Sequence, residues 1–223
     1  MGVLTLNNVT YKYEGTDKIV LKGVSANFEA GKVYTIIGRS GSGKSTLLSL
    51  IAGLDTCEGG AILHGEVDLK KLDRDVYRAK GIGVIFQSYN LITNATAIEN
   101  IVLSMNISGS EVPDKKAYAL KLLERVGIDA ETANRRILRL SGGEQQRVGI
   151  ARALAHNPNI IIADEPTGNL DSATEADILN IFTSLAHEDG KCVIIVTHSK
   201  KVTSIADVIY LIKDGQMAEV QAK

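Results

Sequence analysis

Residues Gly38-Arg39-Ser40-Gly41-Ser42-Gly43-Lys44-Ser45-Thr46 decide how this chain folds. They match the phosphate-binding pattern G-x-x-x-x-G-K-[ST], in which glycines let backbone N–H groups converge on phosphate oxygens at the start of a helix. In that arrangement Lys44 reaches the β- and γ-phosphates, and the Ser45 hydroxyl ligates Mg²⁺. The stretch therefore predicts a nucleotide site between a buried strand and an apolar helix.

Short aliphatic runs flank this loop along the chain and end in turn or helix-start signals. One of them, residues 33–37, lies directly before Gly38. Runs of this kind are typical of parallel strands with both faces covered by helices. The same pattern predicts strands at 82–86, 160–163 and 192–196. We also expect strands at 3–10 and 24–29, a turn at 30–31 and a helix over 172–187.

Residues 88–156 are expected to be mostly helical. Apolar residues at helical spacing predict a helix over 115–126, with Gly127 as its C-terminal cap. A second helix is expected to begin at Ser141 and to run to about His156, where a proline follows. The pattern predicts one α/β domain, residues 1–223, with a core formed by 1–87 and 157–223 and a helical insertion at 88–156.

The composition excludes several classes of protein. The 223 residues include 25 Lys and Arg against 26 Asp and Glu, so binding to nucleic acid through overall charge is not expected. Two distant cysteines argue against a disulfide framework. The longest aliphatic runs fall far short of the roughly 20 residues that span a bilayer, and the first residues do not resemble a secretory signal. We expect a cytosolic protein that relies on another chain for any membrane part.

Two adjacent carboxylates end the apolar run at 160–163. Asp164 at the carboxyl end of a parallel strand suits a Mg²⁺ ligand. Glu165 projects differently from its neighbour and is a candidate general base for the attacking water. The alternative is an ordinary exposed pair of acids at a strand end. Beside the phosphate-binding loop, the functional interpretation is favoured.

A further anion site is possible at Leu140-Ser141-Gly142-Gly143-Glu144-Gln145-Gln146-Arg147. Two glycines at the start of a helix expose N–H groups, and Ser141 adds a hydroxyl. The alternative is an N-cap with Glu144 three residues later, which forms a capping box. The pattern alone leaves both interpretations open.

The segment LSGGEQQR, downstream of a phosphate-binding loop, resembles the signature of ABC-type ATPases, and the resemblance covers essentially the whole chain. Other motifs follow in that family's order. Gln87 resembles its Q-loop, Asp164-Glu165-Pro166-Thr167 its Walker B motif with the catalytic Glu, Asn169-Leu170-Asp171 its D-loop, Thr197-His198 its switch histidine, and Tyr13 the aromatic that stacks on adenine.

Three stretches resemble the macrolide-exporter and lipoprotein-release type of this family: QSYNL at 87–91, TAIEN at 96–100 and EPTGNLDS at 165–172. Two positions depart from the pattern. The segment 135–139 lacks the proline often found before the signature. Gly149 replaces the usual alanine, at a cost of about 1 kcal/mol in a helix interior.

The resemblance implies a P-loop NTPase (RecA-like) core with a parallel sheet, an N-terminal antiparallel β subdomain and an inserted helical subdomain. It implies ATP and Mg²⁺ as cofactors and assigns three roles. The catalytic residues are Glu165, His198 and Gln87. The metal ligands are Ser45, Gln87 and Asp164. The nucleotide-binding residues are Tyr13, Gly38, Ser40, Gly41, Ser42, Gly43, Lys44, Ser45, Thr46, Ser141, Gly142 and Gly143.

The function implied is that of an ATP-hydrolysing subunit of a membrane transporter for export, lipoprotein release or antimicrobial peptides. Two copies face head to tail, each ATP meeting the loop of one chain and Ser141 with Gly143 of the other. A permease holds the dimer at the inner face of the cell membrane, and Tyr89, Leu91 and Ile92 are expected to include exposed residues that contact it.

Two alternatives remain open. One is a mechanical signalling subunit that works with a membrane partner and transports nothing. The other is a soluble ABC ATPase, which the single phosphate-binding loop and the lack of a coiled coil make less favoured.

Overall fold

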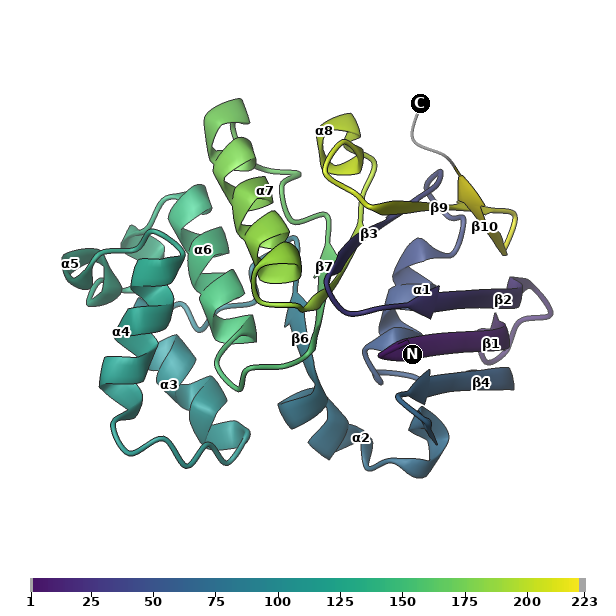
Figure 1. The fold of residues 1–223 in the computed structure, drawn as a ribbon, viewed down its shortest axis with the longest axis horizontal. Coiled ribbons are helices and arrows are strands. Elements are labelled where there is room, and N and C mark those ends of the chain that lie inside the picture. Colours follow the sequence, from purple (N-terminus) through teal and green to yellow (C-terminus); the bar gives the residue numbers. More distant parts are fainter. Residues whose placement is uncertain (1, 221–223) are drawn as a thin grey trace.

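The computed structural model describes residues 2–220. A six-stranded sheet lies at its centre, in the order β10-β9-β3-β8-β7-β6 (Figure 1). Its strands run parallel except β10, which is antiparallel to β9. The strands are β3 (Lys32–Ile37), β6 (Ile82–Ile85), β7 (Ile160–Asp164), β8 (Cys192–Val196), β9 (Val208–Lys213) and β10 (Gln216–Val220).

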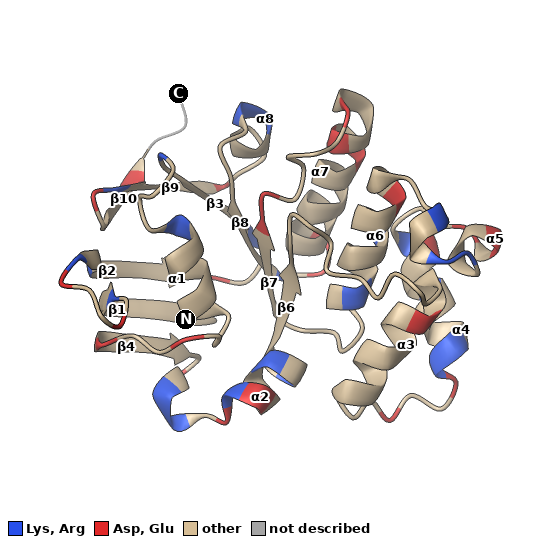
Figure 2. Cartoon of the chain, turned by 180° about the vertical axis from the view of Figure 1, so that it is seen from behind, with Lys and Arg blue, Asp and Glu red and all other residues tan. Residues whose placement is uncertain are grey.

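The central strands of this sheet are buried on both faces, as their aliphatic runs predict. In β7 and β8, Ile161 and Val193 belong to the core on one side of the sheet, whereas Ile162 and Ile194 belong to the core on the other side. Each fully buried aliphatic side chain contributes about 1.5–3 kcal/mol. β6 and β8 carry no charged residue, and charges lie mostly in loops and on helices (Figure 2).

A second, antiparallel sheet includes the N-terminal strands, in the order β2-β1-β4-β5. Helix α1 (Lys44–Ile51) packs into a core that both sheets share, where its Leu47 and Leu50 join Leu4 and Phe28. The strands are β1 (Leu4–Lys12), β2 (Ile19–Phe28), β4 (Gly59–His64) and β5 (Val67–Asp68).

The expected start of β2 is wrong. The sequence pattern predicts a strand at 24–29, but β2 begins at Ile19, because Lys12 of β1 pairs with Ile19 and extends the hairpin. Pairing with β1 thus places the first residues of β2 in a strand, although their sequence does not alternate between apolar and polar residues. The strands β4, β5, β9 and β10 also lie in segments for which no strand is predicted.

Helices cover the remaining face of the parallel sheet (Figure 1). α6 and α7 contact the sheet, and α3, α4 and α5 pack outward from α6. Phe182 of α7 and Val148 of α6 share one core with Val193 of β8. The helices are α3 (Ala97–Ile107), α4 (Lys115–Arg125), α5 (Ala130–Ala133), α6 (Gly142–Ala153) and α7 (Ser172–His187).

The predicted helix ends are met at α4 and α7 but not at α6. Gly127 follows α4 with a φ of +80°, as a C-terminal cap requires. α6 ends at Ala153 rather than near His156. The N–H of Leu154 is shared between the carbonyls of Ile150 and Ala151, so the chain tightens into a turn there. Short elements complete the fold: α2 (Arg74–Val76), α8 (Lys200–Thr203), 3₁₀ turns at Leu69–Lys71 and Ile137–Arg139, and a π-helical turn at Tyr77–Gly81.

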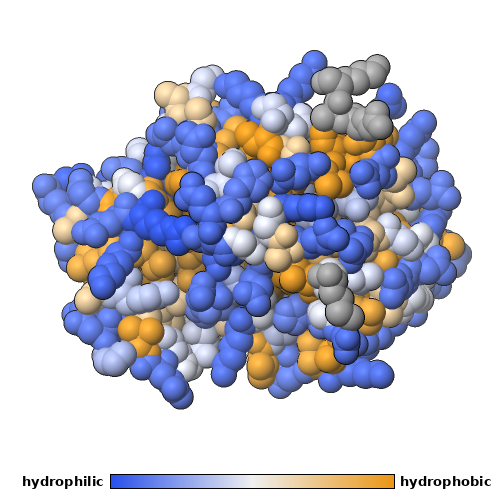
Figure 3. All heavy atoms as spheres, viewed as in Figure 1, coloured by the Kyte–Doolittle hydropathy of each residue, from blue (hydrophilic) through white to orange (hydrophobic). Residues whose placement is uncertain are grey.

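The surface mixes hydrophilic and apolar residues, and apolar residues form separate groups on the face seen in Figure 3. Within residues 2–220, no helix combines the length and the apolar character that crossing a bilayer requires.

The strand order determines where a functional site can form. Because β3, β6, β7 and β8 are parallel, their carboxyl ends meet at one edge of the sheet, and the loops that follow them converge there.

Candidate nucleotide site

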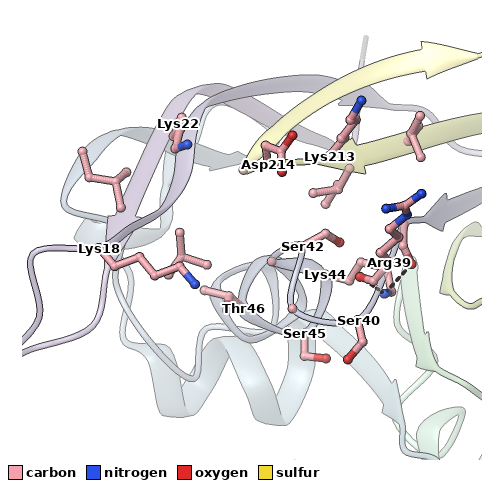
Figure 4. Close-up of a pocket in the computed structure, with 18 of the residues that line it drawn as sticks. Lys18, Lys22, Arg39, Ser40, Ser42, Lys44, Ser45, Thr46, Lys213 and Asp214 are labelled. Carbon is pink, nitrogen blue, oxygen red and sulfur yellow. Dashed lines mark hydrogen bonds between the residues drawn. The ribbon is translucent and has the colours of Figure 1, made fainter.

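A cavity of about 1250 Å³ lies at this edge of the sheet (Figure 4). The loop between β3 and α1 forms its floor, Gln87 follows β6, and Asp164 ends β7. Glu165 and His198 lie in the loops after β7 and β8. The cavity brings together thirteen of the predicted site residues from five separate parts of the chain: Tyr13, Gly38, Ser40, Gly41, Ser42, Gly43, Lys44, Ser45, Thr46, Gln87, Asp164, Glu165 and His198.

The glycines of the loop are required by its geometry. Gly43 has a φ of +106°, and a Cβ there would lie 2.9 Å from a methyl group of Leu21. A Cβ on Gly38 would lie 2.4 Å from the carbonyl oxygen of Ile212. α1 begins directly after the loop without a side-chain cap. Its first N–H groups are therefore available to an anion, which is the arrangement that binds phosphate.

Positive charge surrounds this loop. Lys44 Nζ donates hydrogen bonds to the carbonyl oxygens of Gly38 (2.8 Å) and Arg39 (3.1 Å), so the ammonium group lies across the loop. Lys18 and Lys22 border the cavity on the β2 side, and Lys213 borders it at the end of β9 (Figure 4). Clustered cations at a concave surface attract polyanions such as triphosphates.

Tyr13 lies at the rim of the cavity, where its side chain is half exposed. Its hydroxyl shares a 2.7 Å hydrogen bond with Thr46 Oγ1, and its ring packs edge-to-face on Tyr11 with centroids 5.2 Å apart. The aromatic side chain is therefore tethered to the first turn of α1. An exposed aromatic face at this position can stack on a base.

Asp164 and Glu165 project into the cavity side by side. Burial, together with the neighbouring Glu165 carboxylate, raises the pKa of Asp164, while the Lys44 ammonium opposes this effect. A half-buried carboxylate next to a second one is stabilised by a cation. The two adjacent carboxylates therefore favour the binding of a positive ion near Asp164.

Glu165 is held in an unusual backbone conformation. Its φ is +44°, a region that costs a non-glycine residue of order 1–3 kcal/mol and that clusters at functional sites. Its N–H donates to the carbonyl of Val196 (2.8 Å), which ties it to the end of β8. Its carboxylate accepts a hydrogen bond from Thr197 Oγ1 (3.0 Å) and is hydrogen-bonded to Nδ1 of His198 (2.7 Å). Glu165 and His198 thus form a fixed pair.

The predicted residues of the signature segment lie outside this cavity. Ser141 caps α6, and the capping box forms: Ser141 Oγ accepts from the N–H of Glu144, whose carboxylate accepts from the N–H of Ser141. Gly143 permits the close approach of α7, because a Cβ there would lie 2.5 Å from a methyl group of Thr174. One chain therefore does not bring Ser141, Gly142 and Gly143 to its own phosphate-binding loop.

A family model described as ABC transporter matches residues 21–168, from β2 through the loop after β7. The chain belongs to the ABC transporter family. The lipoprotein-releasing system ATP-binding protein LolD of Legionella pneumophila is 38% identical over 220 residues, which cover 96% of both chains. The macrolide export ATP-binding/permease protein MacB of Mannheimia succiniciproducens is 42% identical over 224 residues, 98% of this chain and 34% of MacB.

A solved structure agrees with these sequence matches. It is the dimeric post-hydrolysis state of the ATP-binding cassette MJ0796 of Methanocaldococcus jannaschii bound to ADP and Pi. The TM-score is 0.88 at 37% identity, with 99% of this chain and 100% of the other covered. The resemblance to ABC ATPases of the macrolide-exporter and lipoprotein-release type and the P-loop NTPase fold are both confirmed. The protein is an ATP-binding, ATP-hydrolysing member of the family.

Sequence reasoning missed several residues of the ABC ATPase cavity. Lys18 and Lys22 reach it through the β1–β2 hairpin, and no local motif marks them. Lys213 and Asp214 reach it from the turn between β9 and β10. That turn has a usable signal, since Asp214-Gly215 between two apolar runs is a hairpin dipeptide. The N–H of Lys22 donates to the carbonyl of Gly215 (2.8 Å), which fixes this turn beside β2.

Replacing Lys44 with alanine is expected to weaken ATP binding about 10- to 100-fold or more, because a hydrogen-bonded charge typically contributes about 1.5–3 kcal/mol. Titration calorimetry with ATP measures the change. Lys121→Ala, which removes an exposed lysine of α4, is the control and should bind ATP as the wild type does. An ATP affinity of Lys44→Ala within twofold of the wild type would contradict the role given to this residue.

Proposed function

We propose that this ABC ATPase powers a membrane permease of the export or lipoprotein-release type from the inner face of the cell membrane. The observation that carries the proposal is the division of the predicted site. One chain gathers the phosphate-binding loop, Gln87, Asp164, Glu165 and His198 in one cavity, while Ser141 lies outside it. Such a half-site needs a second chain, and a permease can use the closing and opening of two chains as a two-state element.

Mg²⁺ fits the residues at the end of β7. Ser45, Gln87 and Asp164 offer hydroxyl, amide and carboxylate oxygens, the ligand types that Mg²⁺ prefers, and all three line the cavity. Burial and the neighbouring Glu165 carboxylate raise the pKa of Asp164, and a cation next to this carboxylate would offset both effects. When bound there, Mg²⁺ neutralises charge on the β- and γ-phosphates.

We assign proton removal from the attacking water to Glu165. A carboxylate performs this role when it is aimed correctly and ionised. The strained backbone and the hydrogen bond from Thr197 aim it, and His198 limits its rotation by binding the other carboxylate oxygen. Tyr13 stacks on the base, and Lys44 binds the β- and γ-phosphates.

Glu165→Gln is expected to retain ATP binding but to slow hydrolysis about a hundredfold or more, the effect of losing a general base. An amide keeps the shape of the side chain but cannot take the proton. ATP turnover measures the rate, and size-exclusion chromatography with ATP should detect an accumulated ATP-bound dimer. Hydrolysis at the wild-type rate would overturn the role of Glu165, and a monomer at high ATP would argue against the dimer.

The proposed dimer is head to tail, with two ATP molecules between the chains. Each ATP then contacts the loop of one chain and Ser141, Gly142 and Gly143 of the other. The helix N-terminus at Ser141 supplies N–H donors for the γ-phosphate in that arrangement. The related cassette MJ0796 was crystallised as a dimer with ADP and Pi, which supports the proposal. We also propose that residues 88–156 form a helical subdomain that carries this helix.

Mixing two inactive variants tests this arrangement. Ser141→Ala and Lys44→Ala are each expected to hydrolyse ATP poorly. In a mixed dimer, one site takes its loop from the Ser141→Ala chain and its signature from the Lys44→Ala chain, so that site is intact. Mixing should therefore restore part of the ATPase rate in a titration of one variant against the other. No recovery at any ratio is the result expected if each site is built within one chain.

The permease contact is proposed on α3. Ile92, Leu103 and Ile107 are 48%, 41% and 68% exposed. Asn100, three residues before Leu103 on α3, binds the backbone N–H and carbonyl of Ile92 (2.8 and 3.2 Å) and so holds the Ile92 backbone beside this helix. Leu103 and Ile107 are four residues apart and lie on one helix face. The result is an apolar strip that suits a short amphipathic helix of a membrane protein.

The two other residues expected at this contact are less suited to it. Leu91 packs against the core that lies between the parallel sheet and helices α3, α4, α6 and α7. Tyr89 is half-buried, and its hydroxyl lies 3.0 Å from where a Cβ on Gly142 would be. Both side chains are therefore occupied within the chain, and Ile92 carries the contact instead.

Ile92→Asp combined with Ile107→Asp is expected to leave ATP binding of the isolated subunit unchanged but to abolish its assembly with the permease. Charges on the strip cannot be buried against an apolar helix. Pull-down of the tagged subunit from detergent-solubilised membranes, with ATPase assays before and after, measures both effects. Leu54→Asp, on an exposed apolar residue after α1, is the control. Wild-type yield of the membrane protein with the double variant would place the contact elsewhere, and residues 135–139 would be the next candidates.

A measurement of substrate flux through the purified complex separates transport from mechanical signalling.

A further inference from the structure

Glu175 lies near the proposed catalytic pair but belongs to none of the recognised motifs. It stands in the first turn of α7, and its side chain is only 13% exposed. Acids in this turn can serve to cap the helix or to balance its dipole. The cap is already provided, because Asp171 accepts hydrogen bonds from the N–H groups of Ala173 and Thr174. Glu175 is thus free for another role.

The two oxygens of Glu175 have different partners. Oε1 accepts hydrogen bonds from the hydroxyls of Thr167 (3.3 Å) and Ser199 (3.1 Å). Oε2 forms an ion pair with Lys201 Nζ at 2.9 Å. Thr167 lies in the loop after β7, whereas Ser199 lies in the loop after β8. One carboxylate oxygen therefore joins the two loops that carry Glu165 and His198.

These contacts close into a ring. Ser199 N–H donates to Thr197 Oγ1 (3.0 Å), and Thr197 Oγ1 donates to Glu165 Oε2 (3.0 Å). From Glu165 the chain runs through Pro166 to Thr167, which returns to Glu175. Each member of the ring fixes its neighbour, and His198 is held between the two ring members Thr197 and Ser199. Such a network restrains side chains more strongly than separate hydrogen bonds do.

Glu175 remains ionised within this ring. Burial alone would raise the pKa of Glu175, but the hydrogen bonds from Lys201, Ser199 and Thr167 outweigh burial and hold the pKa below its usual value. An ionised carboxylate accepts hydrogen bonds without competing as a donor. Both hydroxyls can then donate to it at neutral pH.

We propose that Glu175 is a positioning residue for ATP hydrolysis, which sets the relative placement of Glu165 and His198 by linking the loops after β7 and β8 through Thr167 and Ser199. The inference rests on the roles proposed above for those two residues. Glu175 touches neither nucleotide nor water in this role. It acts by keeping the general base aimed, and a misplacement of about 1 Å costs up to roughly a hundredfold in rate.

Two substitutions separate the ring from the ion pair. Glu175→Ala removes both, and we expect its kcat for ATP to fall about 10- to 100-fold while KM stays within twofold. Glu175→Gln keeps Oε1 as an acceptor for both hydroxyls but loses the charge that pairs with Lys201. We expect it to recover most of the wild-type kcat. Steady-state ATPase assays of the full chain measure both parameters, and the melting temperature checks that each variant is folded.

Three further variants complete the design. Ser199→Ala opens the ring at another point and should lower kcat by a similar factor, and combining it with Glu175→Ala should add little, because both break the same link. Lys201→Ala should change kcat less than twofold, since Lys201 contacts Oε2 and not Oε1, the oxygen that joins the two loops. Glu131→Ala removes the exposed ion pair with Arg135 in the first turn of α5 and serves as the matched control.

Several outcomes would overturn the inference. A kcat of Glu175→Ala within twofold of the wild type is one. A second is a loss of kcat in Glu175→Ala that Glu175→Gln does not recover. A third is an equal loss of kcat in Lys201→Ala. In either case the charge of Glu175, and not the ring of hydrogen bonds, would determine the rate. A raised KM with unchanged kcat would assign Glu175 to binding.

Glu165→Gln is assayed alongside to separate the two proposals. If Glu165→Gln hydrolyses ATP at the wild-type rate, the catalytic role proposed for Glu165 has failed. If Glu165→Gln is slow but Glu175→Ala is unaffected, only the positioning role of Glu175 has failed.

Discussion

The parallel pairing of β7 with β8 is the constraint on which the site depends. In this register Asp164 is opposite Val196, so both strands end at the same level. The N–H of Glu165 then reaches the carbonyl of Val196, and the residues that follow each strand meet one another. A shift of one residue would turn every side chain of β7 to the opposite face. Because Ile161 and Ile162 are buried in different cores, such a shift is strongly disfavoured, and the packing of the sheet thereby fixes the geometry of the carboxylates.

Unfavourable backbone conformations accumulate where this edge of the sheet meets solvent. Glu165, Tyr89 and Asn90 all have positive φ, and none is a glycine. Strain of this kind persists only where the surroundings hold it. At Glu165 the hydrogen bonds from Thr197 and to Val196 do so. At Asn90 its carbonyl accepts a hydrogen bond from Arg152 of α6. The loop after Gln87 is therefore hydrogen-bonded to α6, the helix that Ser141 caps.

Local signals predicted four strands of the parallel sheet, β3, β6, β7 and β8, and the residues of the phosphate-binding loop, because each is encoded within a few consecutive residues, whereas the parallel strand β9 was missed. The stretch at 160–163 followed by Asp164 is one such signal. β4 was missed because its partner is remote: it pairs with β1 across some fifty residues of chain. β2 was shortened because its first residues have no alternating pattern of their own and join the sheet only by pairing with β1. Lys18 and Glu175 could not be placed from the sequence, because each reaches the site through contacts between separate segments of the chain. The choice between an anion site and a capping box at Ser141 shows a further limit. The capping box forms, and the anion site proposed there needs a second chain, which the sequence of one chain does not describe.

One chain holds the phosphate-binding loop and the carboxylates in its cavity but does not bring the N–H donors at the start of α6 there. In the proposed dimer, this division would allow hydrolysis to be controlled. The carboxylate pair, the loop and Lys44 are assembled in each chain alone, so ATP can bind before closure. The donors at the start of α6 lie outside that cavity, and in the proposed dimer the second chain would add them. Donors aimed at the charge that develops in the transition state are among the largest contributions to catalysis. Supplying them in trans, as we propose, would make the rate depend on closure of the dimer. A membrane partner at the contact proposed on α3, which packs against α6, would then be able to raise or lower the ATPase rate without touching the nucleotide, by favouring or opposing closure of the proposed dimer.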